Sequence, residues 1–243
     1  MMDIIKKNKH FTIKNNLSFL AEQKTDDQVR TLFNLSVDYR TLAIAHLLGD
    51  ADRDLFFHNI SLSAQMRNEL LLKHKGVGGK PSRFLCASHI QPFFDAIAAG
   101  QDSIAENIAL LSYDHWVEEE EYEEDFYYAH FMYLFIQRVE KEILEKLLVN
   151  FERSLQGNDS SHYTMCQALL KKNQDLFESS VIELLVDRSE QFEKMGERMI
   201  SKSEQYLTEK YIYVEGLALI RIAKSIGLKI RDEYTGCPAI AIV

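Results

Sequence analysis

Proline and glycine are scarce in this chain, with 3 prolines and 10 glycines among 243 residues. These residues end helices and form tight turns, and a β-sandwich or barrel would need turn signals about every 8–12 residues. Apolar residues make up 46% of the sequence, which is enough to bury a sizeable core in a chain of this length. We therefore predict an all-α protein, an irregular multi-helix bundle or array of helical hairpins, folded as a single domain over residues 1–243.

Apolar spacing and its interruptions predict where the helices lie. The expected helices cover residues 26–48, 52–74, 88–99, 101–112, 125–155 (one long helix or a broken pair), 161–172, 175–195 and 209–226. Residues 1–25 are polar and weakly patterned, so we expect them to be loosely ordered or to form one short helix. The glycine-rich stretch 76–81 is a predicted loop, and the apolar end of the 205–243 region is expected to be a short extended piece. A repeat of fixed period, which would indicate a regular solenoid, is not found.

The net charge of −9 is concentrated in one part of the chain. Residues 84–137, the acidic segment, contain eleven Asp and Glu residues and no Lys or Arg, whereas the rest of the chain has 26 acidic and 28 basic residues. Such a segment disfavours direct nucleic-acid binding, which needs Lys and Arg for phosphate, and it favours a partner with a basic surface. The alternative is a solvated loop and helix start, where the helix dipole favours carboxylates.

Aromatic residues accompany the acidic ones over residues 114–125, the acidic run. Tyr and Trp beside charged groups are typical of protein–protein contact sites, and we expect Trp116 and Tyr122 to contact a partner. The predicted partner-binding residues are Asp114, Trp116, Glu118, Glu119, Glu120, Glu121, Tyr122, Glu123, Glu124 and Asp125. Directly after them, residues 126–136 are apolar on all sides of a helix, which predicts a helix at the centre of the core or covered by a partner.

The sequence carries no recognisable catalytic or metal-binding motif. The stretch GVGGKPS has Pro81 where a phosphate-binding loop has Ser or Thr, and it follows a predicted helix. Cys86 and His89 have no second pair at metal-ligand spacing, and neither GxSxG nor HExxH occurs. We predict no catalytic residue, no metal and no cofactor. The three dispersed cysteines favour thiols over a disulfide framework, and the polar start and the absence of a long apolar run predict a cytoplasmic protein without a membrane span.

Glu215 lies on the apolar stripe of the last predicted helix, aligned with Leu219, Ile222 and Ile226. An ionised carboxylate needs a partner there, because burying it alone is costly. Arg40 interrupts the apolar pattern of an early helix in the same way. We therefore predict a buried structural ion pair between Glu215 and Arg40.

The same C-terminal stretch resembles the immunity protein 49 family of bacterial polymorphic toxin systems. The resemblance lies in Glu215-Gly216-Leu217-Ala218-Leu219, in Ile222-Ala223 and Gly227-Leu228, in the central AIAAG of residues 96–100, and in the acidic-aromatic stretch 123–134. It covers about half of the chain, from about residue 85 onward. The matching positions are those of packing residues, and the family has no catalytic residues to transfer.

The resemblance implies an immunity protein that binds a cognate toxin tightly and blocks its active or substrate-binding site. From the charge alone, the toxin is expected to have a basic surface and to cleave nucleic acids, because an acidic surface competes for a phosphate-binding site. Two alternatives stay open. One is a helical adaptor or scaffold without a toxin partner, and the other is an all-helical enzyme, which a pocket with converging Asp, Glu and His would favour.

Overall fold

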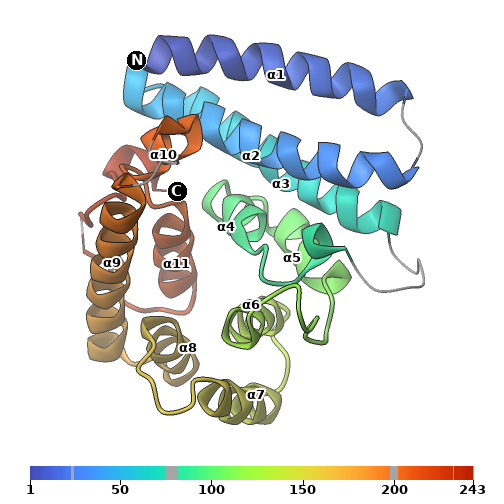
Figure 1. Ribbon diagram of the computed structural model, residues 1–243. Helices are drawn as coiled ribbons and strands as arrows, with labels where there is room; N and C mark the ends of the chain where they lie inside the picture. Colours follow the sequence, from blue (N-terminus) through green and yellow to red (C-terminus); the bar gives the residue numbers. More distant parts are fainter. Residues whose placement is uncertain (23–24, 75–81, 198–201, 232, 243) are drawn as a thin grey trace.

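The computed structural model describes residues 1–243 except 23–24, 75–81, 198–201, 232 and 243 (Figure 1). The predicted loop at 76–81 lies outside the described residues. Over the described part the chain forms eleven α-helices and no β-strand, so the all-α fold class is confirmed. The helices are α1 (Met2–Glu22), α2 (Thr25–Asp50), α3 (Arg53–His74), α4 (Gln91–Ala98), α5 (Asp102–Leu111), α6 (Glu123–Ile136), α7 (Lys141–Ser154), α8 (Ser161–Lys171), α9 (Gln174–Gly196), α10 (Glu204–Glu209) and α11 (Val214–Ser225).

Local signals fix several helix ends. The long 125–155 pattern is a broken pair, because Arg138 adopts a left-handed backbone (φ 56°) between α6 and α7. Ser160 caps α8 by accepting a hydrogen bond from the backbone N–H of Tyr163 at 3.3 Å. Lys172, left-handed at φ 48°, ends that helix, and Asn173 caps α9 through the N–H of Leu176 at 3.0 Å.

Residues 2–22, expected to be loosely ordered or to form one short helix, form one continuous helix that is longer than expected. Lys6 and Lys9 tie it to α2 through Asp50 and Asp38, both at 2.7 Å. The apolar tail forms a 3-10 turn at Ala239–Ala241 rather than an extended piece. Polar anchoring of this kind leaves no apolar periodicity for sequence analysis to detect.

The helices are arranged in a ring in which α2 packs between α1 and α3, and α11 packs on α4 (Figure 1). One hydrophobic cluster extends from Val29 on α2 to Ala241 near the C-terminus. The predicted central helix is α6, whose Phe126, Phe131 and Met132 are buried in this cluster. Among the described residues, no helix is long and apolar enough to cross a membrane.

Candidate functional site

The acidic run folds into a compact turn held by one of its own carboxylates. The side chain of Glu121 accepts hydrogen bonds from the backbone N–H of Val117 at 3.1 Å and of Ser88 at 2.9 Å. The indole N–H of Trp116 donates to the backbone carbonyl of Glu121 at 2.9 Å. Val117 is buried beneath the turn. Glu121 therefore fastens the acidic run to the segment before α4, a role that the sequence did not indicate.

This turn directs most of the predicted partner-binding residues outward. Tyr122 is 74% exposed and Trp116 is 36% exposed, so both rings are accessible at the surface. Glu121 and Glu123 are half-buried, and the other acidic residues of the run are exposed, namely Asp114, Glu118, Glu119, Glu120, Glu124 and Asp125. The structure thus brings the ten residues together on one exposed turn and the start of α6. Whether they bind a partner stays a prediction.

Two other acidic residues of the acidic segment form ion pairs with arginines of other helices. Asp95 on α4 is completely buried. Asp102 at the start of α5 forms an ion pair with Arg221 of α11, with 2.7 Å between Oδ1 and Nη1. Asp102 and Glu106 are exposed, but the other six exposed carboxylates of the segment lie in the acidic run, where the exposed negative charge is therefore concentrated.

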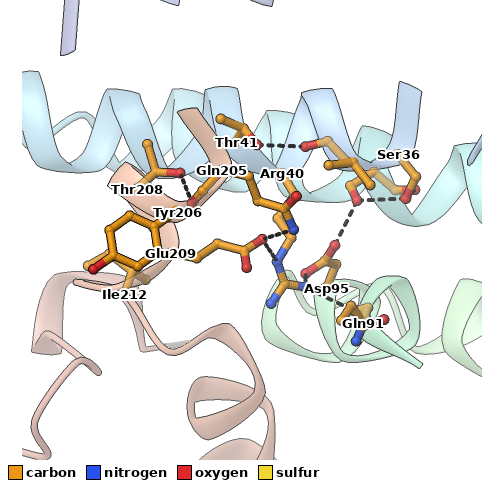
Figure 2. Close-up of polar contacts among 12 residues, drawn as sticks. Ser36, Arg40, Thr41, Gln91, Asp95, Gln205, Tyr206, Thr208, Glu209 and Ile212 are labelled. Carbon is orange, nitrogen blue, oxygen red and sulfur yellow. Dashed lines mark hydrogen bonds and ion pairs between the residues drawn. The ribbon is translucent and has the colours of Figure 1, made fainter. Parts of the chain in front are cut away.

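Arg40 on α2 is the hub of a polar centre at the junction of α2, α4 and α10, drawn in Figure 2. Its Nη1 lies 2.5 Å from Oδ1 of Asp95, and its Nε lies 3.2 Å from Oε1 of Glu209. The other oxygen of Asp95 accepts a hydrogen bond from Ser63 at 2.7 Å, and Ser63 is in turn hydrogen-bonded to Ser36 at 3.0 Å. The centre therefore links helices from the beginning, the middle and the end of the chain.

Burial and ion pairing oppose one another in this centre. Burial raises the pKa of Asp95 to about 6, because the charge of Arg40 and the hydroxyl of Ser63 offset only part of the lost hydration. Burial also lowers the pKa of Arg40, but Asp95 and Glu209 outweigh it and the net shift is upward. Arg40 is therefore a fixed positive charge whose neutralisation depends on both carboxylates.

Glu215 has other partners than the predicted Arg40. Its Oε1 accepts a hydrogen bond from the Tyr128 hydroxyl at 2.5 Å and lies 3.4 Å from Nε2 of His162. Burial raises the pKa of Glu215, but His162 and Tyr128 outweigh it, so the net pKa is lowered. The predicted direct pair with Arg40 is wrong because Glu215 faces α6 and α8, whereas Arg40 reaches α4 and α10.

Arg40 and Glu215 nevertheless line the same cavity of about 410 Å³. Asp125, His162 and Glu209 also line it, so carboxylates and an imidazole converge there. Among the described residues, no group of three or more His, Cys, Asp or Glu side chains is placed to hold a metal ion. The cavity adjoins the acidic run, because Asp125 belongs to the run and Ser88, another lining residue, is bonded to Glu121.

The cysteines are buried free thiols. Burial raises the pKa of Cys86 to about 11 and that of Cys237 to about 12, so neither is ionised at neutral pH. Cys237 packs against α11 at Gly216, where an added Cβ would lie 2.7 Å from the Cys237 sulfur and 2.4 Å from the Tyr213 ring. Gly216, one of the residues in the C-terminal motif, is therefore required for close packing.

These features define an all-α protein in which Glu121 fastens an exposed acidic run to the core. The family model for immunity protein 49 matches residues 25–239 of the 243, and the chain belongs to this family. The match extends well beyond the resemblance seen from about residue 85 onward, and it leaves out α1. Neither a curated protein nor a solved structure matches the chain.

Proposed function

We propose that this protein is a cytoplasmic immunity protein that binds a cognate toxin through the acidic run and blocks the toxin's active or substrate-binding site. The observation that carries the proposal is the outward presentation of negative charge, together with Trp116 and Tyr122, on a turn that Glu121 fastens to the core. Membership in an immunity protein family supports a toxin as the partner. The mode of binding is our inference from charge and exposure.

The expected toxin has a basic surface and cleaves nucleic acids. A concentrated negative field raises the association rate with a basic protein and disfavours acidic ones. An acidic surface resembles the phosphate backbone and can occupy the site that a nuclease uses for its substrate. A direct nucleic-acid ligand for this protein is disfavoured by the same charge.

The first experiment tests neutralisation itself. The proposal expects a toxin-domain gene next to the gene for this chain; its product is expressed alone and together with this chain, and growth and copurification are measured. The proposal expects the toxin to stop growth alone, and the pair to copurify and allow growth. Copurification without protection, or protection without a complex, contradicts inhibition by tight binding.

The second experiment tests the surface. The double variant Glu118→Lys and Glu124→Lys changes the acidic run without touching Glu121, and Glu142→Lys with Glu183→Lys makes the same charge change on α7 and α9. The first variant should associate with the toxin at least about tenfold more slowly and with a smaller salt dependence. Equal effects from the two variants would show that only net charge matters.

An enzyme remains a second candidate because of the cavity in which Asp125, His162 and Glu215 converge. Acid–base chemistry requires such groups within reach of a substrate. The variant His162→Gln separates the two functions. An immunity protein that acts by binding through the acidic run should still neutralise its toxin with this change, whereas protection by enzymatic modification of the toxin should be lost.

A further inference from the structure

A groove of about 670 Å³ lies at the C-terminal end of α6, whereas the acidic run lies at its N-terminal end. Most residues that line the groove are apolar, and they come from α4, α5, α6, α7, α8 and α11. Phe135, Val139 and Ile226 are half-buried, so the protein itself covers them only in part. Sites for small organic ligands are mainly apolar hollows of about 300–1,000 Å³, and this groove matches them in size and lining.

The rim of the groove carries more positive than negative charge. Four basic and two acidic side chains line it, namely Arg138, Lys141, Lys172 and Arg221, with Asp102 and Glu106. Both acidic residues lie on α5. Asp102 is paired with Arg221 at 2.7 Å, and Lys141 is paired with Glu145 of its own helix at 3.1 Å. The side chains of the groove therefore have an excess of two positive charges.

Arg138 and Lys172 are the basic residues of the groove without a partner. Both side chains are exposed, and no described carboxylate lies within ion-pair distance of either. Each follows the end of a helix in a left-handed backbone conformation, with φ 56° at Arg138 and φ 48° at Lys172. Such angles are uncommon for residues other than glycine. The two cations therefore stand at tight turns, with their charged groups accessible from the groove.

The ends of the helices do not cancel this positive charge. Four helices end at the groove, namely α4, α6, α8 and α11, and two begin there, namely α5 and α7. Each helix end carries about half an elementary charge, so the helices together contribute about one negative charge. An excess of about one positive charge remains, which matches a ligand with a single negative charge.

We propose that this groove binds a single-chain organic anion of the fatty-acid type, with its carboxylate at Arg138 and Lys172 and its apolar chain on Phe135, Val139 and Ile226. An anionic membrane surface is disfavoured, because it would meet the net charge of −9 of the whole chain. The site does not rest on the toxin-binding proposal, since it lies at the other end of α6. A ligand that binds only the folded state would stabilise the protein.

Decanoate is the probe, and decyltrimethylammonium is the control, with the same apolar chain and the opposite charge. Calorimetric titration of the full chain, below the concentration at which either compound forms micelles, should show saturable one-site binding of decanoate. The cationic control should bind at least about tenfold more weakly. Equal binding of the two compounds, or no saturable decanoate binding, would overturn the proposal.

A charge variant locates the carboxylate. Arg138→Asn with Lys172→Asn removes both unpaired cations, and asparagine tolerates the left-handed backbone of these turns. This variant should bind decanoate at least about fivefold more weakly, because each exposed ion pair is worth up to about 1 kcal/mol. Lys146→Gln with Lys194→Gln makes the same charge change outside the groove and should leave the affinity unchanged. Equal effects of the two variants would refute the site.

A second variant locates the apolar chain. Val139→Phe fills the groove and should weaken decanoate binding at least about tenfold, whereas Val149→Phe on the exposed face of α7 should not. Unchanged binding by a folded Val139→Phe would refute the site, and the charge variant decides alone if that protein does not fold. Vesicles of phosphatidylglycerol should not sediment with the native chain. Vesicle binding that the charge variant loses would assign the groove to a membrane surface and overturn the proposal.

Discussion

Carboxylates occupy two very different environments in this molecule. At the centre, Asp95 is completely buried with a guanidinium nitrogen 2.5 Å away and a hydroxyl at 2.7 Å. In the acidic run, Glu118 and Glu124 are exposed, and no described cation lies within ion-pair distance of them. Buried charges need matched partners, whereas exposed ones gain little from pairing. The centre is therefore expected to determine stability, and the acidic run is available for binding.

The largest effect should follow from breaking the centre. Asp95→Ala leaves Glu209 as the one carboxylate paired with Arg40 and removes the carboxylate acceptor of the Ser63 hydroxyl, and it should lower the free energy of unfolding by about 3 kcal/mol. Urea denaturation measures this loss. The matched control is Asp114→Asn in the acidic run, which should change stability by less than about 0.5 kcal/mol. Similar losses in the two variants would remove the distinction between the regions.

A smaller loss is expected where the two regions meet. Glu215→Gln keeps the size of the side chain but removes the charge that His162 and Tyr128 stabilise, and should cost about 1–2 kcal/mol. Urea denaturation again measures the change, with Glu183→Gln on the exposed face of α9 as the control. An unchanged midpoint for Glu215→Gln would show that this carboxylate is not needed for stability.

The pair of His162 and Glu215 should also make stability depend on pH. The pKa of His162 is raised, by Glu215 against the effect of burial, so its contribution is full below the ordinary value of 6.5 and is lost as pH rises through the raised pKa. The pKa of Glu215 is lowered, so its contribution is present above 4.5 and is lost as pH falls through the lowered pKa. The pair therefore stabilises the fold most between these values.

The variant His162→Gln tests this window. The loss of stability relative to the native chain should be larger near pH 5.5, about the middle of the window, than near pH 8, which lies well above it. Denaturant titrations of both proteins at the two pH values give the difference. An equal loss at both would mean that packing, and not charge, accounts for the role of His162.

The smallest effect on stability belongs to the acidic run. Glu118→Lys with Glu124→Lys should change the free energy of unfolding by less than about 0.5 kcal/mol, because both side chains are exposed. Glu121→Gln is the informative comparison, since its carboxylate accepts from Ser88 and Val117, and it should cost about 1 kcal/mol. If the double variant were the more damaging, the run would be a structural element rather than a binding surface.

Sequence analysis predicted the helices whose apolar stripes face the core, and α2, α3, α5, α8 and α9 lie close to the expected ranges. It missed α10, which has only six residues and is fixed by the ion pairs of Glu204 and Glu209 rather than by an apolar stripe. It expected loose order or one short helix at the start of the chain, where α1 is a long helix anchored by its lysines.

Site residues divide in the same way. The acidic run was visible because charge density is a property of the sequence itself. Arg40 and Glu215 were correctly singled out as charges within apolar patterns, but their partners depend on how distant helices meet. With many carboxylates to choose from, neither Asp95 nor Glu209 could be assigned to Arg40 before the fold was known. The sequence likewise could not show that Tyr128 and His162 contact Glu215, whereas Arg40 only lines the same cavity.

The contact between α1 and α10 has a consequence for synthesis of the protein. Asn8 donates to Glu204 across 196 positions, and Lys9 reaches the same glutamate at 3.1 Å. A nascent chain emerges from its N-terminus, so these links can close only after Glu204 has left the ribosome. Translation products that stop before Glu204 therefore lack the contacts that join α1 to α10.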